Sequence, residues 1–313
     1  MTQGEDLPVR EALPALKSAL AAGRAAVLEA PPGAGKTTLV PLALLDEPWL
    51  AGRTVVMLEP RRIAARAAAQ RMASLLGEEV GRTVGYRVRQ DVKVSAATRI
   101  EVLTEALLTR RLQHDPALAG IGLVIFDEFH ERSLDADLGL ALALDAQAGL
   151  REDLRILVMS ATLDGARVAK LLADAPVVES AGRAFPVVTH HVGRDPAARL
   201  EEEVARVVRR ALAEETGSAL VFLPGAAEIR RTADLLALTV KDSAVDIVQL
   251  FGALDRAEQD RAIEPAAAGR RKVVLATSIA ETSLTIEGVR IVVDCGLARV
   301  PRFEPDLGLT RLE

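Results

Sequence analysis

The sequence predicts an α/β protein with two domains, and three observations carry this prediction. Short apolar runs alternate with amphipathic stretches, which is typical of parallel sheets covered by helices on both faces. The chain has 313 residues, more than one hydrophobic core usually spans. The alternation is interrupted at 179–200, where glycines and prolines replace the helical pattern. We therefore expect two parallel sheets flanked by helices, with the domain junction in this stretch.

Apolar runs and helical spacing place the elements of each domain. In the first part of the chain, strands are predicted at 25–30, 54–58, 99–103, 122–126 and 155–160. Helices are predicted between them at 36–46, 61–76, 104–113 and 164–173. A long helix at 200–214 then precedes strands predicted at 218–223, 245–250, 271–276 and 290–295. We expect a first domain over residues 1–183, a linker region over 184–198 and a second domain over 199–313.

Charge and cysteine content exclude several classes of protein. The net charge of −5 argues against a general DNA-coating protein, so contact with nucleic acid must come from local arginine clusters. A single cysteine, Cys295, excludes an internal disulfide framework and a cysteine-based zinc site. We expect Cys295 to be a buried thiol in a strand. Apolar runs are too short for a membrane span and the N-terminus lacks a signal-peptide pattern, which predicts a cytoplasmic protein without membrane contact.

The stretch "EAPPGAGKTTL" (29–39) follows a predicted strand and opens a predicted helix, as a phosphate-binding loop does. Gly33 and Gly35 let the backbone turn its N–H groups toward phosphates at the positive end of the helix dipole. Lys36 is expected to reach the β- and γ-phosphates and Thr37 to place its hydroxyl on Mg²⁺. The strict pattern begins with Gly, whereas Ala30 stands here, and the alternative interpretation is a turn before a helix. The nucleotide-binding candidates of this loop are Gly33, Ala34, Gly35, Lys36, Thr37 and Thr38.

Acidic residues follow the apolar run "GLVIF" in "IFDEFHER" (125–132). The carboxyl end of a parallel strand is where such sheets bind ligands, so Asp127 is expected to hold Mg²⁺ and Glu128 to polarise the attacking water. A solvated acidic loop is the alternative, but it does not explain why the acids begin where a buried strand ends. His130, taken alone, is more often a hydrogen-bonded structural residue than a catalyst.

Two further stretches gain weight from their positions. "MSATL" (159–163) ends the next strand, where Ser160 and Thr162 are candidates to hydrogen-bond the acidic stretch and sense the γ-phosphate. In "LEPRR", Arg61 and Arg62 fall at a predicted helix N-terminus, where the dipole disfavours cations. A bound phosphate would relieve that conflict. An arginine-rich solvated face is the alternative interpretation.

The ordered motifs resemble those of DEAH-box helicases of superfamily 2. They are "APPGAGKT", "EPRR", "LTEALL", "DEFHER", "SATL", "FLPGAAEI" and "ATSIAETSLTIEG". Within that family, "DEFHER", "LPGAAEI" and "VVDCGLARVPRFEP" look most similar to the bacterial HrpB group. The resemblance runs from about residue 8 to the end of the chain. It implies two RecA-like P-loop NTPase domains, with ATP bound between them and single-stranded RNA lying across both.

The resemblance also assigns roles residue by residue. It adds His130 to Lys36, Asp127 and Glu128 as a catalytic residue. It places Arg71 against the adenine, and Ser283 and Glu287 near the ribose of the nucleotide. It implies RNA contacts from Arg61, Arg62, Thr104, Thr277 and Ser278.

No arginine-rich string of the Q-R-x-G-R-A-G-R type, which supplies arginine fingers in the family, occurs in the sequence. We therefore expect the second domain to be incomplete and this chain to bind ATP and Mg²⁺ but hydrolyse ATP slowly, since such fingers contribute about 10³–10⁵ in rate. The leading hypothesis is an ATP-dependent RNA helicase acting on single-stranded RNA, with DNA as an alternative substrate and protein partners unpredicted. A nucleotide-dependent RNA clamp or scaffold is the second hypothesis. A small-molecule kinase is the third, although no acceptor site is recognisable.

Overall fold

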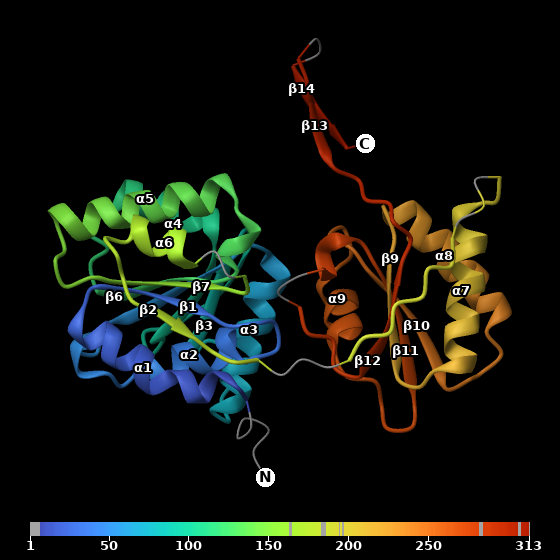
Figure 1. Cartoon of the computed structure of the whole chain (residues 1–313), viewed down its shortest axis with the longest axis horizontal. Helices are drawn as coiled ribbons and strands as arrows, with labels where there is room; N and C mark the ends of the chain where they lie inside the picture. Colours follow the sequence, from blue (N-terminus) through green and yellow to red (C-terminus); the bar gives the residue numbers. More distant parts are fainter. Residues whose placement is uncertain are drawn as a thin grey trace. The chain divides into compact units, whose positions relative to one another are not determined.

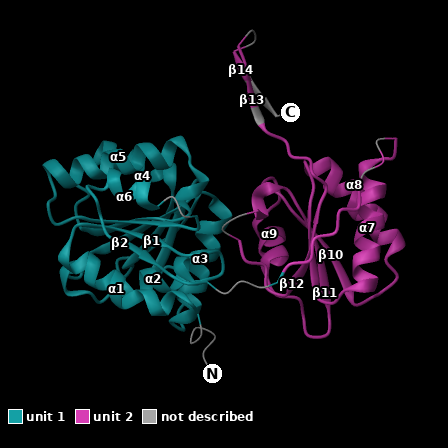
Figure 2. Ribbon diagram, viewed as in Figure 1, with its two compact units in different colours: residues 1–186 teal, residues 187–313 magenta. Residues whose placement is uncertain are grey.

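The structure is a computed structural model that describes residues 7–162, 165–182, 186–193, 195, 197–281, 284–305 and 308–312. The chain folds into two compact units, unit 1 over residues 1–186 and unit 2 over residues 187–313 (Figure 2). Each unit is an α/β layer structure built around its own sheet, as the alternating sequence pattern predicts. No helix within the described ranges is long and apolar enough to span a membrane.

Unit 1 is built on an eight-stranded sheet with the order β4-β3-β5-β2-β6-β7-β1-β8. Its strands are β1 (Ala25–Glu29), β2 (Thr54–Glu59), β3 (Val84–Val88), β4 (Asp91–Lys93), β5 (Ile100–Thr104), β6 (Ile121–Phe126), β7 (Arg155–Ser160) and β8 (Val177–Glu179). The strands pair in parallel except β4, which forms an antiparallel hairpin with β3. The sheet is therefore parallel, as predicted, except for the antiparallel hairpin at this edge.

Helices cover both faces of this sheet (Figure 1). On one face lie α1 (Val9–Ala22), α2 (Lys36–Leu44) and α3 (Arg62–Leu75), and Leu28, Met57 and Ile125 point into the core beneath them. On the other face lie α4 (Glu105–His114), α5 (Leu134–Gly149) and α6 (Gly165–Leu171), packed over Val27, Leu58 and Phe126. Short 3-10 helices, η1 (Pro48–Leu50) and η2 (Phe129–Glu131), follow α2 and β6. The central strands, such as β1, β2 and β6, are thus buried on both faces, which explains their continuous apolar runs.

Unit 2 has a four-stranded parallel sheet with the order β10-β11-β9-β12. Its elements are α7 (Leu200–Glu214), β9 (Ser218–Phe222), α8 (Ala226–Thr239), β10 (Val245–Leu250), α9 (Arg256–Ile263), β11 (Arg271–Ala276), η3 (Ser278–Ala280) and β12 (Val289–Asp294). Helices α7 and α8 cover one face and α9 packs on β10 from the other (Figure 1). A two-stranded hairpin, β13 (Pro301–Glu304) with β14 (Leu309–Leu312), follows the sheet.

Strand β12 departs from the expected two-sided burial. Its residues alternate between buried and exposed, with Val293 buried and Val292 exposed. Cys295 lies just past the end of this strand and is half-buried, so its prediction as a buried strand thiol is wrong. The reason is the position of β12 at the edge of the sheet, where only the face beneath α7 is covered within unit 2.

Candidate active site

The predicted phosphate-binding loop joins β1 to α2 in unit 1. Gly33 and Gly35 have φ values of +78° and +89°, a region in which side chains are strained. A Cβ on Gly35 would lie 2.8 Å from Cδ1 of Leu7, so both conformation and space favour glycine. The amide of Val9 donates to the carbonyl of Ala34 at 3.1 Å, which ties the loop to the start of α1. Because α2 begins at Lys36, its unpaired N–H groups lie where an anion binds well.

Two side-chain contacts join this loop to the acidic stretch after β6. Lys36 Nζ donates to Glu128 Oε1 at 3.0 Å, and both side chains are buried. Thr37 Oγ1 donates to Asp127 Oδ2 at 2.5 Å. The adjacent Thr38 continues the first turn of α2, its amide bonded to Gly35. The fold thus brings together the lysine, the hydroxyl and the two carboxylates that the sequence singles out at separate strand ends.

Glu128 has an unusual backbone conformation. Its φ of +48° is a left-handed value that non-glycine residues rarely adopt. Such a residue costs on the order of 1–3 kcal/mol, and residues of this kind cluster at functional sites. The amide of Glu128 donates to Asp127 Oδ1 at 2.8 Å, and its carbonyl accepts from the amide of Glu131 at 2.9 Å. These bonds hold the sharp turn between β6 and η2 and fix the directions of the two carboxylates.

Burial raises the pKa values of two acids at this site. Burial, followed by the charge of Glu128, raises the pKa of Asp127 from 3.8 to about 6. Glu59, the last residue of β2, is a third buried acid here, and its pKa is raised well above 4.5 by burial and then by Asp127. Glu59 is not among the site residues predicted from the sequence, whereas the two arginines that follow Pro60 are. The available signal was the same as for Asp127, namely an acid directly after an apolar strand.

His130 lies between the acidic stretch and the end of β7. Its Nδ1 is 3.4 Å from Glu128 Oε2 and 3.3 Å from the amide nitrogen of Ala161. Ser160 and Thr162 bond to each other, with the amide of Thr162 donating to Ser160 Oγ at 3.3 Å. A link from this segment to the acidic stretch therefore runs from the Ala161 amide to His130, and the roles expected of Ser160 and Thr162 stay predictions.

The RNA candidates of unit 1 lie at helix N-termini. Arg61 is the residue before α3, and its Nη2 is 3.2 Å from Glu131 Oε2. This ion pair offsets the unfavourable position of a cation at a helix N-terminus without a bound phosphate. Arg62 is exposed at the first position of α3, and Arg71, the adenine candidate, is exposed in the later part of the same helix. Thr104 occupies the position before α4, and its side chain makes no capping hydrogen bond there.

The candidates of unit 2 lie at the carboxyl ends of its strands and in a turn. Thr277 is half-buried and Ser278 is exposed, at the end of β11 and the start of η3. Glu287 is exposed in the turn before β12. Ser283 lies outside the described residues.

The donor set in unit 1 fits Mg²⁺. The Thr37 hydroxyl and the Asp127 carboxylate are hard oxygen donors that lie within hydrogen-bond distance of one another. Asp127 is almost fully buried at 2% exposure, and burial, followed by the charge of Glu128, raises its pKa, so its ionised form is favoured by added positive charge nearby. A bound divalent cation would supply that charge.

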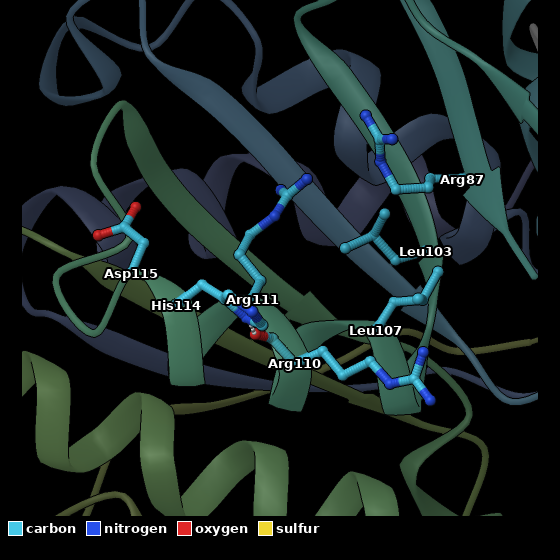
Figure 3. A pocket seen from close by; sticks show the side chains of 7 residues that line it. All are labelled: Arg87, Leu103, Leu107, Arg110, Arg111, His114 and Asp115. Atoms are coloured by element: carbon cyan, nitrogen blue, oxygen red, sulfur yellow. Dashed lines mark hydrogen bonds between the residues drawn. The ribbon is translucent and has the colours of Figure 1, made fainter.

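A cavity of about 320 Å³ lies elsewhere in unit 1, between β3 and α4 (Figure 3). Arg87 and Arg111 border it, and each donates to a carboxylate oxygen of Glu101 at 2.8 Å. Leu103 forms part of its wall and belongs to the core beneath α4, on the face opposite α2. The cavity is therefore separate from the lysine and carboxylates of the phosphate-binding loop.

Comparisons with known families match both units. The family model described as DEAD/DEAH box helicase matches residues 10–171, and the model described as helicase conserved C-terminal domain matches residues 199–305. The ATP-dependent RNA helicase HrpB of Escherichia coli is 54% identical over 98% of this chain. The pre-mRNA-splicing factor ATP-dependent RNA helicase prp22 of Schizosaccharomyces pombe is 36% identical over 99% of this chain.

Solved structures agree with the sequence matches. A crystal structure of the Escherichia coli DEAH/RHA helicase HrpB superimposes with a TM-score of 0.90 at 53% identity, over 98% of this chain and 39% of that one. The chain spans 38% of the length of the Escherichia coli relative and 27% of the fission-yeast relative. The prediction of two tandem RecA-like domains is confirmed. The chain belongs to the DEAD/DEAH box helicase family, and its sequence and fold are of the HrpB type.

Proposed function

We propose that this chain binds ATP with Mg²⁺ in unit 1 and couples its hydrolysis to movement along single-stranded RNA or to the unwinding of duplexes. The observation that carries the proposal is the pair of contacts that join Lys36 to Glu128 and Thr37 to Asp127. They assemble a phosphate-binding cation, a metal-binding hydroxyl and two carboxylates at one end of a sheet, the arrangement that phosphoryl transfer from a nucleotide requires. The family relationship supports RNA as the polymer.

Each candidate site residue of unit 1 has its own proposed role. The loop from Gly33 through Thr38 cradles the phosphates with backbone N–H groups. Lys36 Nζ exchanges its bond with Glu128 for the β- and γ-phosphate oxygens, where it stabilises charge that develops during transfer. Glu128, released from the lysine, orients the attacking water and accepts hydrogen bonds from it at its carboxylate.

Thr37 and Asp127 are the proposed holders of Mg²⁺, whose chemistry is to neutralise charge on the phosphate oxygens. His130 lies beside Glu128 and the Ala161 amide. It is proposed to couple the position of Glu128 to that of the segment that holds Ser160 and Thr162. Contacts to the nucleotide base and ribose are proposed for Arg71, Ser283 and Glu287.

RNA is proposed to bind through its backbone, to Arg61, Arg62 and Thr104 of unit 1 and to Thr277 and Ser278 of unit 2. Helix N-termini and hydroxyl groups suit phosphate oxygens and carry no information on base sequence. Binding should therefore weaken steeply with salt and depend little on sequence. Single-stranded DNA is the comparison substrate.

Replacement of Glu128 by Gln tests the proposal, because Gln keeps the shape and can still accept from Lys36. ATP turnover should fall by about 10²–10⁴-fold, the range of acid–base contributions, while binding of a fluorescent ATP analogue is retained. Addition of single-stranded RNA should stimulate the wild-type chain and leave the variant unchanged. Equal turnover in the two chains would overturn the catalytic assignment, and absence of RNA stimulation or binding would overturn the choice of polymer.

The same experiment separates the enzyme from the RNA clamp. A clamp would show ATP-dependent RNA binding with turnover at background in both the wild-type chain and the Glu128→Gln variant. The ion pair between Lys36 and Glu128 favours the enzyme, since a protein that only binds nucleotide has no need of a buried carboxylate beside the phosphate-binding lysine.

A further inference from the structure

Glu59 is the most deeply buried acid near the phosphate-binding loop. It ends β2 and is 1% exposed. Both of its carboxylate oxygens are buried, and among the described residues neither makes a hydrogen bond of ordinary geometry, so that the neighbouring Asp127 carboxyl is its main polar contact. Most buried polar side chains have such partners, so a carboxylate with two unpartnered oxygens calls for an explanation.

The sheet directs Glu59 to the same face as Asp127. Strands β2 and β6 pair in parallel with Leu58 opposite Phe126, and the amide of Asp127 donates to the carbonyl of Leu58 at 3.1 Å. Side chains alternate along a strand, and Met57 and Ile125 both point into the core beneath α2. The next residues on that face are Glu59 and Asp127, so both acids point toward the helix that begins with Lys36 and Thr37.

Among the described residues of this face, the charged groups do not balance when all of them are ionised. Glu59, Asp127 and Glu128 are buried acids, and Lys36 is the buried cation paired with one of them. In their ionised forms these groups leave two negative charges, which a divalent cation would neutralise. A carboxylate buried without a partner is costly, and an apolar side chain in its place would avoid that cost. Its placement beside Asp127 is therefore best explained by a cationic ligand.

We propose that Glu59 is a third carboxylate of the Mg²⁺ site, where it accepts hydrogen bonds from the water ligands of the ion held by Thr37 and Asp127. The inference rests on the proposed function, because it assumes nucleotide-bound Mg²⁺ at these residues. Mg²⁺ keeps several water ligands when it binds to proteins, and those waters need acceptors. Outer partners of this kind change metal affinity by about 10–100-fold when they are mutated. Glu59 acts as a positioning residue, since it touches the hydration shell and not the phosphates.

The test is a Mg²⁺ titration of binding of a fluorescent, non-hydrolysable ATP analogue to the wild-type chain and the Glu59→Gln variant. Gln preserves size and hydrogen-bonding ability but removes the charge. We expect the Mg²⁺ concentration at half-saturation to rise about 10-fold, with little change in analogue affinity at saturating Mg²⁺. Glu101→Gln is the matched control, because Glu101 is a buried glutamate on β5 of the same sheet that bonds to Arg87 and Arg111.

The readout distinguishes a metal role from a merely structural one. A structural role would change the unfolding midpoint of unit 1 and leave the Mg²⁺ midpoint as in the wild type, which would overturn the proposal. An equal rise in the Glu101→Gln control would also overturn it, because the effect would then not depend on position in the site. If the wild-type chain binds the analogue without any dependence on Mg²⁺, the proposed function itself fails, a result separate from failure at Glu59.

Discussion

Acidification from pH 7 to pH 5 should stabilise unit 1 through Asp127, provided that no Mg²⁺ is present. The pKa of Asp127 is raised by burial to about 6 in the folded chain, against 3.8 for an ordinary aspartate. The folded state then binds a proton more tightly than the unfolded state does. Its stabilising contribution is complete below the unfolded pKa and is lost as the pH rises through the folded pKa.

The size of this effect follows from the same values. A difference of one pKa unit between the folded and unfolded states corresponds to about 1.36 kcal/mol, so the full contribution to the free energy of unfolding is about 3 kcal/mol. Between pH 7 and pH 5 only part of it develops, about 1.4 kcal/mol in the free energy of unfolding. Replacement of Asp127 by Asn removes the titrating group, and the variant should gain less on acidification by about this amount. Because Glu59 lies beside Asp127, the difference reports on the coupled pair.

The assay uses the single tryptophan of the sequence, Trp49. It lies in η1 of unit 1, packs against the core beneath α2, and has the Arg155 guanidinium 4.7 Å from its ring centroid. Urea unfolding followed by tryptophan fluorescence therefore reports on unit 1 alone. Both chains are unfolded in EDTA at each pH, which removes divalent cations. Titrating groups that the two chains share then cancel in the comparison. An equal pH dependence in the wild-type chain and the Asp127→Asn variant would refute the reasoning.

Two further predictions concern the loop and the arginines. Gly35→Ala should lower the free energy of unfolding of unit 1 by more than about 1 kcal/mol, because it adds a clash with Leu7 to an unfavourable φ. Gly120→Ala, at a φ of +77° with open space around it, should lower it by less in urea unfolding. Equal losses in the two variants would contradict the clash. Arg61→Ala should lower the salt dependence of RNA binding by about one counterion. Glu131→Gln, which removes the negative charge paired with Arg61, should tighten RNA binding in a fluorescence anisotropy titration. Unchanged affinity in both variants would show that Arg61 does not contact RNA.

Much of the fold was predictable because its signals are local. Strands such as β2, β6 and β7 are continuous apolar runs, and their predicted bounds differ from the observed ones by a residue or so. Short edge strands gave no such signal, and β4 and β8 were not predicted. Helix α1 was also missed, since Pro14 lies inside it and weakens the helical pattern. Helix α5, whose mostly apolar sequence lacks a clear polar face, was missed as well.

The sequence by itself determined the chemistry of the candidate site, because a lysine, a hydroxyl and carboxylates at strand ends are set by residue type and position along the chain. Tertiary structure decided which strand ends are neighbours. The pairing of β2 with β6 brings Glu59 beside Asp127, and the turn after β6 brings Glu131 to Arg61. Strand order depends on contacts between residues far apart in the chain, which no local pattern encodes. Burial followed from the same packing, and burial is what raises the pKa of both Asp127 and Glu59.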